Sequence, residues 1–251
     1  MNYVEFGSAH NDTILLLHGG GLSWWNYREA AMFLRNEYHV LLPILDGHAG
    51  SDRPFTTIEE NASEIISFID THLNGTPLLI GGLSLGGQIL LEMLSQRGDI
   101  CACALVESAA VLPSKRTNAL IAPSVGCSYG LIRNRSFARL QFQFLHMKPE
   151  LFEDYYRDTS RIKKQDMIAF LKANTSYTLK DSFREASAAI HVYAGEKETG
   201  TILRSAEAVC RMRPSCILHR MKGLRHGEFS ICHADRYADN IRRIISGEST
   251  F

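Results

Sequence analysis

The sequence predicts an α/β protein in which a mostly parallel central sheet is flanked by helices and carries an inserted helical segment. Short runs of Leu, Ile and Val alternate with amphipathic stretches along much of the chain. This alternation is typical of parallel strands joined by crossover helices. A length of 251 residues fits one such domain with an insertion better than two independent domains.

The predicted elements follow from the two periodicities of the apolar residues. Strands are expected where short apolar runs occur, at 14–17, 40–42, 78–80, 101–106, 190–193 and 217–221. Helices are expected where apolar residues recur about every 3.6 positions, at 25–36, 58–73, 86–97, 202–212 and 229–246. Thr57 and Glu60 have the spacing of a capping box, which predicts that a helix begins after Thr57.

The segment 112–184 breaks this rhythm, because helical patterns follow one another there with no strand between them. We therefore expect a core formed by 1–111 and 185–251, with 112–184 inserted as a helical lid. The segment contains thirteen Lys or Arg and six Asp or Glu, a net charge of +7, and ten of the 23 aromatic residues. These aromatics form either the core of a helical subdomain or the wall of an apolar pocket to which the basic residues attract an anionic substrate.

Composition excludes several classes of partner. The formal net charge is zero, so no overall field favours nucleic acid or an anionic membrane. The opening residues lack the pattern of a secretory signal, and the apolar run at 14–17 is too short to span a bilayer. The six cysteines include no CxxC pair, so we expect reduced thiols in a cytoplasmic protein.

A candidate nucleophile lies between the predicted strand at 78–80 and the helix that follows it. Gly82, Ser84 and Gly86 form the pattern G-x-S-x-G. At such a position the chain turns sharply, and glycines two residues either side remove side chains that would collide. The turn would raise the Ser84 hydroxyl above the sheet, at the positive end of the following helix.

A serine nucleophile also needs a site that stabilises the oxyanion. The strand at 14–17 ends in His18 and three glycines, whose backbone N–H groups can approach a substrate carbonyl closely. We expect the N–H groups of Gly20 or Gly21 to join that of Leu85 as the oxyanion hole. His18 is interpreted as structural. Trp24 and Trp25, just beyond the glycines, are candidates either for the substrate pocket or for core packing.

The predicted general base is His226. It lies in a loop that leaves the last predicted strand and enters the last helix, at the mouth of the sheet. The orienting acid should follow a strand between the nucleophile and this histidine. Glu198 is preferred, because the acid is expected three residues after the glycine that ends the strand. Glu196 and Glu107 remain alternative acids.

These motifs together resemble the α/β-hydrolase superfamily, in its lidded single-domain form, over nearly the whole chain. The matching segments are His18-Gly19-Gly20-Gly21, the turn at Ser84, the G-x-x-acid run ending at Glu198, the His226-Gly227 loop and the altered loop Asp46-Gly47-His48-Ala49-Gly50-Ser51. The resemblance implies eight strands, a helical cap after the sixth of them, and no cofactor. Only about a dozen residues precede the first core strand, so the edge strands at that end are expected to be shortened or missing.

The resulting hypothesis is hydrolysis of a small-molecule carboxylic ester or acyl substrate, apolar or anionic, through an acyl-enzyme on Ser84. The same residues could instead serve thioester or carbon–carbon cleavage, because the superfamily hosts many reactions. A ligand-sensing protein of the same fold is the alternative from another functional class. No HExxH or paired Cys/His spacing occurs, so no metal site is predicted.

Overall fold

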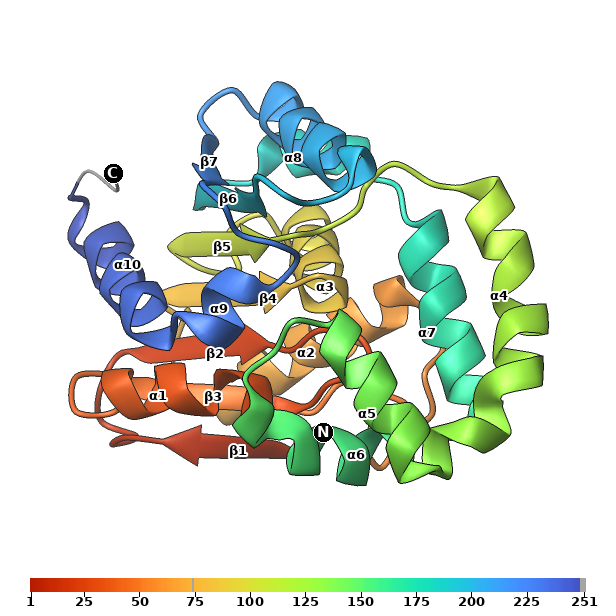
Figure 1. Ribbon diagram of the computed structural model, residues 1–251. Coiled ribbons are helices and arrows are strands. Elements are labelled where there is room, and N and C mark those ends of the chain that lie inside the picture. The colour runs from red at the N-terminus through yellow and green to blue at the C-terminus, as the bar shows by residue number, and fades with distance from the viewer. Residues whose placement is uncertain (74, 249–251) are drawn as a thin grey trace.

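The apolar runs form the centre of a seven-stranded sheet in the computed structural model, which describes residues 1–73 and 75–248 (Figure 1). The strands are β1 (Tyr3–Phe6), β2 (Thr13–Leu17), β3 (His39–Pro43), β4 (Leu79–Leu83), β5 (Cys103–Glu107), β6 (Ala189–Gly195) and β7 (Ile217–Met221). Their order is β1-β3-β2-β4-β5-β6-β7, and every neighbouring pair except β1 and β3 is parallel. The predicted α/β class and all six predicted strands are confirmed.

The sheet differs from the expected eight strands at its N-terminal edge. A single short strand, β1, lies antiparallel to β3, with Tyr3 opposite Pro43 and Phe6 opposite Val40. Its side chains alternate between exposed and half-buried, so it lacks the continuous apolar run that marks the buried strands. The edge strands are therefore shortened to one, as the few residues before β2 suggested.

Helices cover both faces of the sheet. The core helices are η1 (Trp24–Tyr27), α1 (Arg28–Leu34), α2 (Ile58–His72), α3 (Leu85–Gln96), α8 (Gly200–Met212), α9 (Glu228–Cys232) and α10 (Ala234–Ser246). Leu15 and Leu17 belong to the core cluster that includes residues of α2, α3 and α8, whereas Ile14 and Leu16 belong to the cluster with α1 and α10. Alternate residues of β2 thus fill the two layers, as the period of a strand requires.

Two helix boundaries follow from local backbone chemistry. The hydroxyl of Thr57 accepts a hydrogen bond from the N–H of Glu60 at 3.0 Å, so α2 begins where the capping pattern predicted. The single helix expected at 229–246 is instead divided into α9 and α10 at His233, whose φ of −123° and ψ of 51° are not helical. The break turns the chain between the functional loop and the long amphipathic helix that covers the sheet.

Helices alone connect β5 to β6. They are α4 (Lys115–Ser128), η2 (Tyr129–Arg133), α5 (Arg135–Phe144), η3 (Pro149–Leu151), α6 (Phe152–Thr159), α7 (Lys164–Ser176) and η4 (Asp181–Glu185). In Figure 1 the arrows of β2 and β5 point toward the side where α4, α5 and α7 stand. Buried Phe142 packs between Phe152 and Tyr155, which are also buried, with ring centroids 5.5 and 5.3 Å from its own. Part of the aromatic content of the insertion therefore forms a local core.

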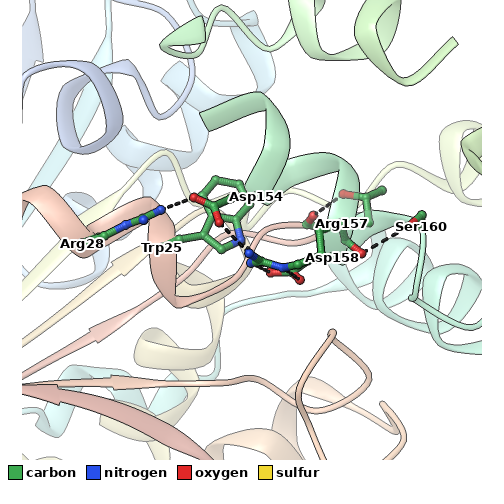
Figure 2. A network of polar contacts seen from close by, with 8 residues as sticks. Trp25, Arg28, Asp154, Arg157, Asp158 and Ser160 are labelled. Carbon is green, nitrogen blue, oxygen red and sulfur yellow. Dashed lines mark hydrogen bonds and ion pairs between the residues drawn. The ribbon is translucent and has the colours of Figure 1, made fainter. Parts of the chain in front are cut away.

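Helix α6 is attached to the start of α1 by a polar network (Figure 2). Nε1 of Trp25 donates to Oδ2 of Asp158 at 2.9 Å, and Arg157 donates to both carboxylate oxygens of Asp158 at 2.7 and 2.8 Å. Arg28 pairs with Asp154 one turn earlier on α6. Trp25 is buried, with 1% of its surface exposed. The network therefore fixes α6 to the core beside the glycine-rich loop after β2.

The cysteines differ from the expectation of six reduced thiols. Cys210, near the end of α8, is joined by a disulfide to Cys216, just before β7, and their Cα atoms lie 5.0 Å apart. The short turn between the two elements brings these positions within the range that a disulfide can bridge. The other four cysteines are free. The expectation of reduced thiols is thus wrong for this pair.

The attachment of α6 can be tested by comparing neighbouring tryptophans. Trp25→Phe removes a buried donor to a carboxylate, so we expect the free energy of unfolding to fall by about 2 kcal/mol. Trp24 is only half-buried, and Trp24→Phe should have less than half this effect. Urea denaturation of the two variants measures the difference. Equal losses would show that the Trp25–Asp158 bond contributes nothing specific.

Candidate active site

Ser84 occupies the sharp turn between β4 and α3, with φ of 53° and ψ of −109°. Such a backbone conformation is strained for a residue with a side chain. It is fixed by a hydrogen bond of 2.8 Å from the Ser84 N–H to the carbonyl of Glu107 on the neighbouring strand. A Cβ atom at Gly82 would lie 2.4 Å from the carbonyl oxygen of Gly86, and one at Gly86 would lie 2.1 Å from that of Leu17. Both flanking glycines are therefore sterically required.

Two buried histidines shape the glycine-rich loop after β2. Nε2 of His18 accepts from the N–H of Leu45 at 3.1 Å, and Nε2 of His48 accepts from the N–H of Gly21 at 3.0 Å. Burial lowers the pKa of His18 well below its ordinary value and lowers that of His48 to about 4. Both rings are neutral at pH 7 and hold the loop in place, so His18 has the structural position predicted for it.

The candidate oxyanion donors differ in what their N–H groups contact. The N–H of Gly21 donates to His48, so this group is already occupied. Gly20 lies against the start of α3, where a Cβ atom built on it would be 3.5 Å from Cβ of Leu85. The structure thus places Gly20 next to the side chain of Leu85, the residue that follows Ser84.

His226 lies between β7 and α9, and its ring meets a buried carboxylate. Nδ1 of His226 is 2.8 Å from Oε2 of Glu198, whose side chain is fully buried while that of His226 is 49% exposed. Burial would raise the pKa of Glu198. The hydrogen bond and charge of His226, with hydrogen bonds from Ser108 and from the N–H of Gly195, lower that pKa overall. Glu198 is therefore an ionised acceptor at neutral pH.

Ser108 completes the surroundings of this carboxylate and was not predicted from the sequence. Its hydroxyl donates to Oε1 of Glu198 at 2.7 Å, and it accepts the N–H of Gly227 at 3.4 Å. Its φ of 57° is unusual for a residue other than glycine. One sequence feature could have identified Ser108. It follows the predicted strand at 101–106 and Glu107, at the same end of the sheet as the other candidate residues.

The two alternative acids have other partners. Oε2 of Glu196 accepts the N–H of Gly223 at 3.0 Å. Oε1 of Glu107 accepts the N–H of Ser230 at 3.3 Å, and its Oε2 has no hydrogen-bond partner within the described residues. Burial raises the pKa of Glu107 to about 7. Of the three candidate carboxylates, Glu198 is the one that the structure places against His226.

A cavity of about 250 Å³ lies beside the candidate nucleophile and base. Ser84 and His226 both line it, together with Gly19, Gly20, Gly21, Leu22, Leu83, Leu145, Met147, Tyr155, Thr159, Gly227 and Ile231. The core provides Ser84 and His226, and the insertion provides Thr159 and a largely apolar wall of Leu145, Met147 and Tyr155. Trp24 and Trp25 are absent from this lining, because Trp25 turns into the core toward Asp158 and Trp24 contacts Arg28.

Comparison with known proteins identifies the family of the chain. Residues 14–240 match the profile described as the alpha/beta hydrolase family. The chain therefore belongs to the alpha/beta hydrolase family, and the resemblance inferred from its motifs is confirmed.

Two curated proteins are similar to shorter parts of the chain. The magnesium-chelatase 30 kDa subunit of Rhodobacter capsulatus is 33% identical over 93 residues, which are 36% of this chain and 32% of that protein. A soluble epoxide hydrolase of Corynebacterium sp. (strain C12) is 28% identical over 105 residues, 40% of this chain and 35% of that protein. The chain spans about a third of the length of these relatives.

Solved structures share the fold over the whole chain. An enol-lactonase from Burkholderia xenovorans LB400 superposes with a TM-score of 0.83 at 15% identity, covering 98% of this chain and 96% of that one. A thermophilic esterase from Thermogutta terrifontis gives 0.78 at 18% identity, covering 98% and 93%. At such identities the likeness shows the fold alone.

Residues 1–73 and 75–248 contain no helix that is both long and apolar enough to cross a membrane. The same residues hold no group of three or more His, Cys, Asp or Glu side chains arranged to bind a metal ion.

The raised pKa of Glu107 predicts a specific dependence of stability on pH. Between the ordinary pKa of 4.5 and about 7, the folded protein keeps a proton on Glu107 that the unfolded chain has lost. The contribution of Glu107 to the free energy of unfolding therefore falls as the pH rises from 4.5 to about 7, and it is constant above pH 7. Glu107→Gln removes the dependence, so the variant should gain about 2–3 kcal/mol relative to wild type between pH 4.5 and pH 7.5.

Urea denaturation of both proteins across this pH range measures the gain. Glu196→Gln is the control, because this carboxylate is exposed. A difference between wild type and Glu107→Gln that did not change with pH would contradict a protonated Glu107.

Proposed function

We propose that this protein is a serine hydrolase that cleaves carboxylic esters, with Ser84 as nucleophile, His226 as general base and Glu198 as the acid that orients His226. The observation that carries the proposal is the 2.8 Å contact between His226 and buried Glu198 at the edge of a cavity that Ser84 also lines. A base oriented by a buried carboxylate beside a strained serine is the arrangement that nucleophilic catalysis requires.

Acylation begins with attack of the Ser84 hydroxyl on the ester carbonyl while Nε2 of His226 takes the hydroxyl proton. Glu198 accepts a hydrogen bond from Nδ1–H, which leaves Nε2 unprotonated and able to take the proton of Ser84. The same carboxylate stabilises the imidazolium that forms, because it is ionised and shielded from water. Ser108 and the N–H of Gly195 hold Glu198 in this orientation.

The tetrahedral intermediate carries negative charge on the former carbonyl oxygen. We assign its stabilisation to the backbone N–H groups of Gly20 and Leu85, with the N-terminus of α3 adding a favourable dipole. His48 supports this arrangement indirectly, because its bond to Gly21 sets the course of the loop. Backbone N–H groups of this kind are oriented before the charge develops, so they do not need to reorganise during the reaction.

The imidazolium then donates its proton to the alkoxide as the carbon–oxygen bond breaks, which releases an alcohol and leaves the acyl group on Ser84. Water attacks the acyl-enzyme in the second half, with His226 again taking a proton. His226 then returns this proton to the Ser84 oxygen as the acyl–oxygen bond breaks, which releases the carboxylic acid product and restores Ser84. The apolar wall of Leu145, Met147 and Tyr155 supports an apolar group beside the reacting carbonyl.

The nucleophile is tested by Ser84→Ala. Removal of the hydroxyl should lower kcat on p-nitrophenyl butyrate by at least about a thousandfold, on the precedent of triad deletions. Wild type should also be labelled by a fluorophosphonate probe, and the variant should not. Ser124→Ala, which removes an exposed hydroxyl on α4 and keeps the nucleophile, is the control for labelling. Retained turnover in Ser84→Ala would refute the proposal, and a wild-type protein inert to both reagents would favour a ligand-binding role.

The acid is tested by two amide substitutions made two residues apart. Glu198→Gln keeps the shape of the side chain but loses the charge that stabilises the imidazolium, so kcat should fall by about a thousandfold or more. Glu196→Gln should change kcat less than twofold, since Glu196 contacts the N–H of Gly223. Initial rates on p-nitrophenyl butyrate measure both. Equal effects of the two substitutions would remove Glu198 from the triad.

A further inference from the structure

A second concave surface lies beside the catalytic cavity, with a volume of about 630 Å³. We call it the α5 groove. It is bounded by α5, by the start of η3 and α6, and by the loop that carries His226. Arg139, Phe142, His146, Met147, Phe152 and Arg225 are among its lining residues. The floor is aromatic, because Phe142 and Phe152 are buried, and the rim carries positive charge.

The two arginines of the α5 groove are available to a ligand. Neither Arg139 nor Arg225 forms an ion pair with any described residue, in contrast to Arg135, Arg157 and Arg184 of the insertion. The guanidinium of Arg139 lies over the ring of Phe152, 4.9 Å from its centroid. Stacking of this kind orients a guanidinium and leaves its N–H groups free at the edges.

The acidic residues of the same groove are already engaged. Glu228 accepts the N–H of Arg225 at 2.8 Å, and Glu153 pairs with Arg135. Their charges are thus partly compensated, while those of Arg139 and Arg225 are not. A guanidinium without a carboxylate partner favours an anion, above all a carboxylate that can accept two parallel hydrogen bonds.

The α5 groove and the catalytic cavity share a wall. Met147 lines both spaces, and neighbouring residues alternate between them, since Leu145 faces the cavity and His146 the groove. On the opposite side Arg225 lines the groove and His226 lines the cavity. The catalytic cavity and the α5 groove therefore adjoin at Met147.

We propose that the α5 groove is an anion subsite, and that the esters this protein hydrolyses carry a carboxylate on the part of the molecule that extends past Met147. The inference rests on the proposed esterase function and names its substrate class. The aromatic floor accommodates the intervening methylene groups, and Arg139 and Arg225 bind the carboxylate. The net charge of +7 on the inserted segment also attracts such a substrate.

Matched ester pairs test the proposal. Mono-p-nitrophenyl adipate is compared with the neutral ester in which an isopropyl group replaces the carboxylate. A second pair places the carboxylate on the alcohol, as the acetate of a six-carbon ω-hydroxy acid and its isopropyl analogue. The ratio of kcat/KM for the anionic over the neutral ester should exceed one in at least one pair. The pair that shows it identifies the half of the substrate that occupies the groove.

The arginines are tested by substitution. Arg139→Gln and Arg225→Gln should each lower this ratio about fivefold, the effect of losing one solvent-accessible ion pair. Raising the salt concentration should lower the wild-type ratio in the same direction. Arg116→Gln is the matched control, because it removes one exposed positive charge from α4, outside the groove. It should leave both kcat/KM values unchanged.

Binding of adipate, followed by isothermal titration calorimetry, provides a readout that needs no turnover. Adipate should bind wild type and Arg116→Gln but bind Arg139→Gln and Arg225→Gln several-fold more weakly. No anionic preference in either pair, or an equal loss in Arg116→Gln, would overturn the anion subsite while leaving the esterase intact. Adipate binding without hydrolysis of any ester would instead refute the proposed function and retain the subsite.

Discussion

The contact between His226 and Glu198 is the interaction on which the organisation of the site depends. A fully buried carboxylate is costly unless its oxygens are satisfied. Here Oε1 accepts from Ser108 and from the N–H of Gly195, and Oε2 meets His226. These bonds link the ends of β5, β6 and β7 at one point. Removing any of these partners would leave the buried carboxylate of Glu198 with an unsatisfied oxygen. The bonds therefore keep the ends of the three strands together.

Strain at two neighbouring turns is maintained by the same edge of the sheet. Ser84 after β4 and Ser108 after β5 both have positive φ without being glycine. Each N–H is tied to the next strand, that of Ser84 to the carbonyl of Glu107 and that of Ser108 to the carbonyl of Tyr193. Such conformations persist only where surrounding bonds over-determine them. The serines are thus fixed by the parallel sheet rather than by their own loops.

The sequence predicted what depends on local pattern. Buried parallel strands appear as continuous apolar runs, and Glu198 was preferred from its distance to the strand-ending glycine. What it missed depends on contacts between distant residues. Ser108 acquires its role by meeting a carboxylate 90 positions away, and Gly21 is occupied by His48 from another loop. The half-exposed strand β1 and the Cys210–Cys216 pair likewise became visible only from tertiary placement.

In the proposed function, the inserted helices contribute to substrate selection while the core supplies the reacting groups. Their attachments to the core include the bond from Trp25 to Asp158 and two bonds between Asn174 and Gln88 of α3. Nε2 of Gln88 donates to the backbone carbonyl of Asn174, and the side-chain amide of Asn174 donates to Oε1 of Gln88. Helix α5 and the turn after it contribute Leu145 and Met147 to the cavity and Arg139 to the groove. Changes there can alter the pocket without touching Ser84 or the sheet. The aromatic residues of the segment therefore have both of the expected roles. Some form a local core, and Tyr155 belongs to that core and also lines the cavity.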